Sequence, residues 1–200
     1  MAGRSHLRSV KRIAILASGS GSNAQRIMEY FRGSALAEVV LVGCDQPAAG
    51  VIQRAWDQGV ASYLFNGAQL RDGSVLRELQ GLKVDLVVLA GFLRLIPPDL
   101  VRAFPDRILN IHPALLPKYG GKGMYGHHVH TAVIAAGEVE SGITIHRVNE
   151  HYDEGTILFQ ATCPVLPDDT PDTLAQRIHA LEHAHFPRLV QQEVARLAEG

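Results

Sequence analysis

Short apolar runs and amphipathic stretches alternate along the first half of the chain. The continuous apolar runs are typical of buried parallel strands, and the stretches between them have the spacing of helices packed on one face. The predicted strands are residues 13–17, 38–44, 60–64, 84–90 and 108–112, and the predicted helices are residues 24–31, 48–58 and 69–80. Alternating strands and helices with short connections predict an α/β fold with a single doubly wound, mostly parallel sheet.

The pattern changes in the last third of the chain. Residues 142–148 alternate as a strand, and residues 156–163 form another strand after a turn at residues 153–155. This spacing predicts an antiparallel hairpin at the edge of the sheet. A helix should start at Thr170 and Pro171, and Pro187 is expected to break or kink it before a last amphipathic stretch, which gives C-terminal helices.

Composition is that of an ordinary soluble protein. The 200 residues are 46% hydrophobic and 20% charged, enough for one well-buried core, so we expect a single domain over residues 1–200. The basic segment 1–12 lacks the apolar region of a signal peptide and is expected to be flexible, which favours a cytoplasmic protein without a membrane segment. Trp56, on a predicted helix, is expected to lie in the core.

Charge and cysteine content exclude several function classes. A net charge of -1 provides no broad footprint for nucleic acid. Cys44 and Cys163 are far apart and are interpreted as buried thiols in a reducing compartment. His127, His128 and His130 suggest a metal site, but no Cys or carboxylate lies at ligand spacing, so we expect no metal and a helix start beside the glycine-rich segment 118–126.

Candidate chemistry is concentrated at residues 108–113. Asn110 and His112 lie two positions apart on a predicted strand, so both side chains point to the same face, and Pro113 ends the strand. An amide donor beside an imidazole can hold an oxyanion and move a proton. The alternative is a structural pair bonded to the backbone. The carboxyl end of a strand in such a sheet is where ligands bind.

A glycine-rich loop joins the first strand to the first helix. Residues 18–23 read Ser-Gly-Ser-Gly-Ser-Asn, and backbone N–H groups at the helix start suit a phosphate. A tight turn with nothing bound is the alternative. Gly19, Gly21 and Ala24 also fit a relaxed dinucleotide-binding pattern, with Asp45 ending the next strand, so a nicotinamide-dependent oxidoreductase remains open.

Two further segments follow strands. Residues 91–98 are unusually apolar for a loop, which indicates either a buried crossover or a slot for a flat heterocycle. Asp153 belongs to an Asp-x-Gly turn, and such turns are mostly structural. If Asp153 instead reaches His112, its carboxylate should raise the pKa of the imidazole and keep it charged.

Taken together, four motifs resemble the formyltransferases that use 10-formyltetrahydrofolate. They are Asn110-x-His112-Pro113, Asp153-x-Gly155, the Leu-Ala-Gly-Phe-x-Arg run at residues 89–94 and the Leu-Leu-Pro-Lys-Tyr run at residues 115–119. The glycine loop and Glu182-His183-x-x-Phe186-Pro187 narrow the resemblance to the glycinamide ribonucleotide formyltransferases of purine biosynthesis. The resemblance covers nearly the whole chain from Ile13 onward.

The resemblance implies roles for individual residues. The ribonucleotide would be bound by Gly21, Ser22, Asn23 and Glu182, and catalysis would depend on Asn110, His112 and Asp153. The folate would be bound by Arg71, Leu93, Arg94, Leu95, Ile96, Asn110, Asn149, Glu150, His151, Tyr152 and Asp153. Segment 118–126 is longer and richer in glycine than the commonest family form, which leaves its effect on the pocket open.

The implied reaction moves a formyl group from 10-formyltetrahydrofolate, a co-substrate, to the amine of glycinamide ribonucleotide. Asn110 and a charged His112 would stabilise the oxyanion, with no covalent nucleophile and no metal. The partners would be small molecules, and the protein a monomer or homodimer. A formyltetrahydrofolate deformylase or a formyltransferase for another amine is the alternative within the same chemistry.

Overall fold

The computed structural model describes residues 10–199, which contain seven strands and seven helices in alternation over most of the chain. The strands are β1 (Lys11–Ala17), β2 (Ala37–Cys44), β3 (Ser62–Leu64), β4 (Leu86–Leu89), β5 (Ile108–His112), β6 (Glu140–Arg147) and β7 (Ile157–Pro164). The helices are α1 (Ser22–Phe31), α2 (Gly50–Asp57), α3 (Gly67–Arg71), α4 (Ser74–Gly81), α5 (Pro98–Ala103), α6 (His127–Ala135) and α7 (Pro171–Glu199).

All seven strands belong to one sheet, in the order β3-β2-β1-β4-β5-β6-β7. The pairs from β3 to β5 are parallel, whereas β6 runs antiparallel to both β5 and β7. The prediction of a mostly parallel sheet with an antiparallel hairpin at its edge is confirmed. Strand order reverses between β1 and β4, so the segments that follow these two paired strands run to opposite sides of the sheet, which leaves a crevice at their carboxyl ends.

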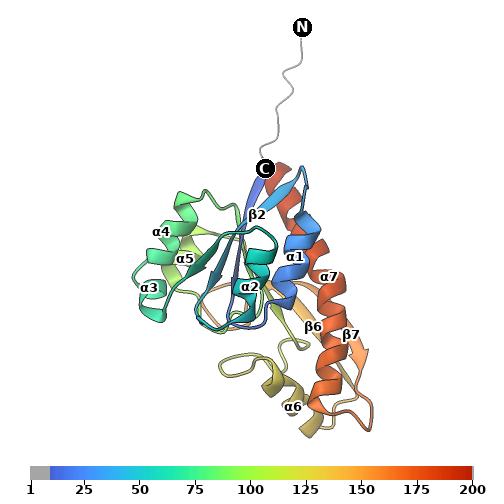
Figure 1. Cartoon of the computed structure of the whole chain (residues 1–200). Helices are drawn as coiled ribbons and strands as arrows, with labels where there is room; N and C mark the ends of the chain where they lie inside the picture. Colours follow the sequence, from blue (N-terminus) through green and yellow to red (C-terminus); the bar gives the residue numbers. More distant parts are fainter. Residues whose placement is uncertain (1–9, 200) are drawn as a thin grey trace.

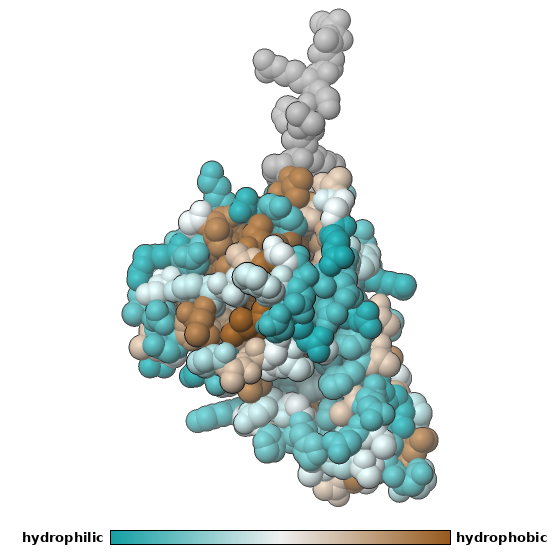
Figure 2. Space-filling view, in the orientation of Figure 1, coloured by the Kyte–Doolittle hydropathy of each residue, from teal (hydrophilic) through white to brown (hydrophobic). Residues whose placement is uncertain are grey.

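Two hydrophobic clusters cover the two faces of the sheet. One lies beneath α1, α2, α6 and α7, and the other beneath α3, α4 and α5, so the fold has three layers (Figure 1). The central strands are buried on both sides, with Ile13 and Ile15 facing one cluster and Ala14 and Leu16 the other. In the space-filling view hydrophobic residues reach the surface between α1 and α4, whereas the surface over α1 itself is hydrophilic (Figure 2).

Pro187 was expected to break or kink the C-terminal helix, and the structure shows no break, because residues 171–199 form one helix. Pro187 lacks the N–H that would bond within the helix, which normally weakens a helix interior. It lies inside α7, and Phe186, Val190 and Val194 around it are fully buried in the core. This packing stabilises the helical conformation on both sides of Pro187.

Three local predictions also differ from the structure. The helix expected at residues 69–80 is divided into α3 and α4, because Gly73 adopts a left-handed φ of 79° and the Asp72 side chain accepts from the Ser74 N–H. Trp56 is 79% exposed, because Val51 and Ala55 form the buried stripe of α2. Lys11 and Arg12 belong to β1, and the rest of the segment expected to be flexible lies mainly at residues 1–9, outside the described residues.

Both cysteines are free and buried, as predicted. Within residues 10–199, no helix combines the length and the apolar character needed to cross a membrane.

Candidate active site

A cavity of about 580 Å³ opens at the carboxyl ends of β1, β4 and β5. It brings together most of the residues singled out in the sequence. The lining includes Gly21, Ser22, Asn23, Leu93, Arg94, Leu95, Ile96, Asn110, His112, His151, Tyr152, Asp153 and Glu182. Arg71, Asn149 and Glu150 do not line it.

The glycine loop forms one end of the cavity. Gly21 precedes α1 in a left-handed conformation, with φ 80°, and a Cβ at this position would lie 2.5 Å from the Val51 side chain. Only glycine fits this position, and it turns the first N–H groups of α1 toward the cavity. Asn23 Nδ2 donates to Glu182 Oε2 at 2.8 Å, which joins the start of α1 to α7. Burial raises the pKa of Glu182, and the Asn23 hydrogen bond opposes this shift.

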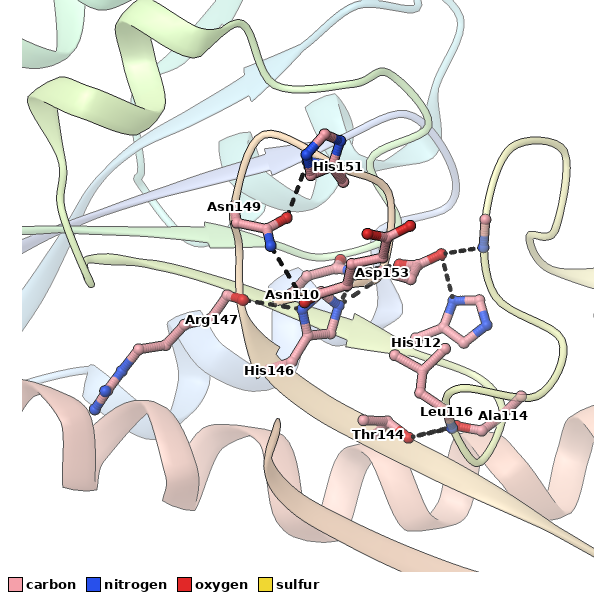
Figure 3. A network of polar contacts seen from close by, with 12 residues as sticks. Asn110, His112, Ala114, Leu116, Thr144, His146, Arg147, Asn149, His151 and Asp153 are labelled. Carbon is pink, nitrogen blue, oxygen red and sulfur yellow. Dashed lines mark hydrogen bonds and ion pairs between the residues drawn. The ribbon is translucent and has the colours of Figure 1, made fainter. Parts of the chain in front are cut away.

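Asn110, His112 and Asp153 meet at the other end of the cavity (Figure 3). Asn110 Nδ2 donates to Asp153 Oδ1 at 3.3 Å, and His112 Nδ1 lies 3.6 Å from Asp153 Oδ2. His112 Nε2 donates to the backbone carbonyl of Tyr119 at 2.7 Å. Because Nε2 is occupied, Nδ1 is the ring atom left for a reacting group.

The prediction that His112 is positively charged is wrong for the ligand-free protein. Burial lowers the pKa of His112 below its usual value, although the Asp153 carboxylate and the Tyr119 carbonyl act in the opposite direction. His112 is only 3% exposed, so loss of hydration outweighs the attraction of Asp153. At neutral pH the ring is therefore neutral and can accept a proton.

Asp153 remains charged in spite of its surroundings. Burial by itself would raise the pKa of this carboxyl group, but the polar groups around it, among them the Gly121 N–H, hold that pKa below its usual value. The Gly121 N–H donates to Asp153 Oδ2 at 3.0 Å. A charged carboxylate beside a neutral imidazole stabilises an imidazolium once it forms.

His146 is part of this cluster and was missed in the sequence. Its Nε2 lies 3.0 Å from Asn110 Nδ2 and 3.5 Å from Asp153 Oδ1, and its Nδ1 lies 3.1 Å from the Arg147 carbonyl. Since a carbonyl only accepts, Nδ1 carries the proton and Nε2 accepts from Asn110. His146 pairs with Asn110 in the β5–β6 ladder. Its place in the alternating pattern of the predicted strand 142–148 was the only sequence signal that could have pointed to it.

The apolar loop after β4 lies along the middle of the cavity. The Leu93 N–H donates to Ser18 Oγ at 3.1 Å, and Arg94 Nε forms an ion pair with Asp45 at 2.6 Å. Arg71 lies nearby, because a Cβ on Gly67 would be 3.2 Å from Arg71 Nη1 and 2.9 Å from Arg94 Nη1. The Asp45 side chain is 2% exposed and committed to Arg94.

Residues 149–153 form a loop whose ends have different roles. Asn149 accepts from the His151 N–H at 2.9 Å and donates to the Glu154 carbonyl at 3.2 Å, so it shapes the loop. Glu150 pairs with Arg102 at 3.2 Å on the outside. His151, Tyr152 and Asp153 face the cavity.

Helix α6 begins at His127, as the sequence predicts, but its histidines have different environments. His127 and His128 are exposed, whereas His130 is 2% exposed and lines the cavity. No group of three or more His, Cys, Asp or Glu side chains within residues 10–199 is placed to hold a metal ion. Burial, with help from neighbouring histidines, lowers the pKa of His130 to about 4.

This buried histidine should make the protein sensitive to acid. The unfolded chain binds a proton on His130 near its usual pKa of 6.5, and the folded protein only near pH 4, so stability is lost as pH falls between these values. We expect His130 to account for a loss of about 2 kcal/mol between pH 7 and pH 5. Urea unfolding of the wild type and of His130→Asn at both pH values measures it; an equal pH dependence in both would contradict the assignment.

Comparison with known proteins identifies the family. The model of the family described as formyl transferase matches residues 11–190, which is nearly all of the chain. The chain belongs to the formyl transferase family. The cluster of Asn110, His112 and Asp153 and the glycine loop both fall inside the matched region.

Individual members of the formyl transferase family resemble the chain closely. It is 35% identical to phosphoribosylglycinamide formyltransferase of Bacillus subtilis, over 92% of the chain and 94% of that protein. It is 44% identical to the trifunctional purine biosynthetic protein adenosine-3 of Drosophila melanogaster, over 89% of the chain but only 13% of that protein. The crystal structure of glycinamide ribonucleotide transformylase 1 from Symbiobacterium toebii superposes with a TM-score of 0.84 at 36% identity, covering 96% of the chain and 89% of that structure.

Proposed function

We propose that the protein transfers the formyl group of 10-formyltetrahydrofolate to the amino group of glycinamide ribonucleotide, in de novo purine biosynthesis. The products are formylglycinamide ribonucleotide and tetrahydrofolate. The observation that carries the proposal is a single cavity with a phosphate-type loop at one end and Asn110, His112 and Asp153 at the other. The relatives named above as glycinamide ribonucleotide enzymes support the same substrate.

The two substrates would enter from opposite ends of the cavity. The N–H groups at Gly21, Ser22 and Asn23 would bind the phosphate, and Glu182 would accept from the ribose hydroxyls. The folate would lie against the apolar loop from Leu93 to Ile96, closed by residues 151–153. The adjacent guanidinium groups of Arg71 and Arg94 suit the carboxylates of a glutamate tail.

The geometry supports a proton transfer through His112. The neutral amine attacks the formyl carbon, and the formyl oxygen becomes an oxyanion. Asn110 Nδ2 then donates to this oxyanion in place of Asp153 Oδ1, to which its hydrogen bond is long, at 3.3 Å. His112 Nδ1 takes the proton that the attacking nitrogen loses, and Asp153 stabilises the imidazolium. The imidazolium then protonates the departing folate nitrogen, which restores neutral His112.

Two alternatives are less consistent with the cavity. A deformylase needs no phosphate loop, yet the start of α1 and Glu182 lie in the same cavity as His112. A nicotinamide dinucleotide would need Asp45 for its ribose hydroxyls, but this carboxylate is buried against Arg94. We further propose a single-domain cytoplasmic enzyme, monomeric or homodimeric, whose partners are small molecules.

A turnover assay tests the proposal directly. Release of tetrahydrofolate from 10-formyltetrahydrofolate is measured with and without glycinamide ribonucleotide, together with the formylated product. We expect release to depend on the ribonucleotide and to equal product formation. Release without ribonucleotide would instead identify a deformylase, and no release under either condition would reject folate chemistry and call for a titration with NAD and NADP.

A further inference from the structure

The segment between β5 and α6 contacts both His112, the proposed proton carrier, and Asp153, which stabilises its charged form. The backbone carbonyl of Tyr119 accepts from His112 Nε2 at 2.7 Å. Two residues later, the backbone N–H of Gly121 donates to Asp153 Oδ2 at 3.0 Å. The position of this short stretch of backbone therefore sets the orientation of the imidazole and of the carboxylate together.

Glu138 binds the same stretch of backbone from outside the cavity, through hydrogen bonds to its side chains. Tyr119 OH donates to Glu138 Oε1 at 2.9 Å, and Lys118 Nζ donates to the same oxygen at 2.8 Å. Glu138 follows the end of α6 and does not line the cavity. The hydrogen bonds from Lys118 and Tyr119 hold the pKa of Glu138 below its usual value, so the acceptor is a carboxylate at neutral pH.

The backbone held in this way would not adopt its conformation easily. Tyr119 has a φ of 55°, in the left-handed region that bulky residues rarely occupy. A Cβ on Gly120 would lie 2.6 Å from Leu116 Cδ2 and 3.3 Å from Asp153 Cβ, so the chain passes close to the site. Such a conformation persists only where neighbouring contacts fix it, and Glu138 binds the side chain of the strained residue itself.

We propose that Glu138 is a positioning residue of the active site. By holding Tyr119, it keeps the Tyr119 carbonyl against His112 and the Gly121 N–H against Asp153. The carbonyl fixes the proton of neutral His112 on Nε2 and leaves Nδ1 free to accept. The roles of His112 and Asp153 rest on the proposed function, but the link from Glu138 to the His112 ring can be measured without substrate.

Four variants separate positioning from general stability. Glu138→Ala removes the acceptor, and Tyr119→Phe removes the hydroxyl but keeps the ring and the carbonyl. Glu138→Gln retains an oxygen that accepts from Tyr119 OH, so it should behave as a rescue. Glu140→Ala is the matched control, because Glu140 is exposed and forms no side-chain hydrogen bond or ion pair within the described residues.

The deciding measurement is the ¹⁵N NMR spectrum of the histidine side chains in the ligand-free protein. Comparison with His112→Asn assigns the His112 ring. We expect Glu138→Ala and Tyr119→Phe to shift its nitrogen signals away from the pure Nε2–H tautomer, and Glu138→Gln and Glu140→Ala to leave them as in the wild type. Unshifted His112 signals in both of the first two variants would overturn the proposal, whatever happens to their melting temperatures. If Glu138→Ala does not fold, Tyr119→Phe decides alone.

Kinetics provide the second measurement. A misplaced proton acceptor should lower kcat of Glu138→Ala roughly tenfold, with nearly unchanged KM for both substrates. An unchanged kcat, or a loss confined to KM, would also overturn the proposal. Failure of the wild type to form product would reject the proposed function instead, and the NMR result would still report on the contact between Glu138, Tyr119 and His112.

Discussion

Replacing His112 with alanine is expected to lower kcat roughly 10³-fold, because the proton acceptor and donor of the proposed reaction is removed. The ribonucleotide affinity should remain nearly intact, since the phosphate loop and Glu182 lie at the other end of the cavity. Single-turnover rates measure the first quantity and calorimetric titration with glycinamide ribonucleotide the second. Equal losses in rate and in binding would refute the role of His112.

The buried position of His112 calls for a second variant. His112 is 3% exposed, so alanine leaves a void and costs stability as well. His112→Gln fills most of the volume but cannot exchange protons near neutral pH, and we expect it to be as inactive as His112→Ala. Recovery of most of the activity in His112→Gln would show that hydrogen bonding, and not proton transfer, is what the ring contributes.

Replacing Gly21 with alanine is expected to weaken ribonucleotide binding roughly 100-fold, because the N–H groups before α1 would be displaced from the phosphate. The added Cβ would lie 2.5 Å from the Val51 side chain, and the left-handed φ of 80° is strained for alanine. The unfolding free energy should also fall, by about 1–3 kcal/mol. Calorimetric titration and urea unfolding measure the two effects.

Gly19→Ala is the matched comparison in the same loop. A Cβ on Gly19 would have no heavy atom within 4 Å, and its φ lies outside the left-handed region. Its unfolding free energy should equal that of the wild type. If Gly21→Ala were as stable as Gly19→Ala and bound the ribonucleotide as tightly as the wild type does, the geometry assigned to Gly21 would be incorrect.

Local pattern was sufficient to predict the residues that a single strand brings together. Alternation placed Asn110 and His112 on one face, and the glycine loop indicated the start of α1 without any other part of the chain. Asp153 lies 41 residues after His112, so the sequence pattern left their contact as a condition, and the resemblance to a family was needed to pair them. His146 was missed because its contact with Asn110 depends on the register of β6 against β5, which no local pattern encodes.

The remaining errors come from effects that depend on the whole fold. The charge of His112 was predicted from one neighbour, Asp153, but burial by the surrounding layers has the larger effect on its pKa. Pro187 was expected to break or kink a helix, and α7 continues through it because residues around the proline are packed in the core. Trp56 was expected to be buried because large aromatic side chains usually are, but it lies on the face of α2 that points away from the sheet.

The bond between Asn23 and Glu182 also orders events during synthesis of the chain. Asn23 leaves the ribosome early, but the carboxylate that its amide meets is made 159 residues later, near the middle of α7. A nascent chain can therefore complete the glycine loop and pair its first strands while the ribonucleotide end of the cavity still lacks a wall. Until α7 docks, the Asn23 amide lacks this carboxylate partner, so the two ends of the chain must come together before this end of the cavity is complete.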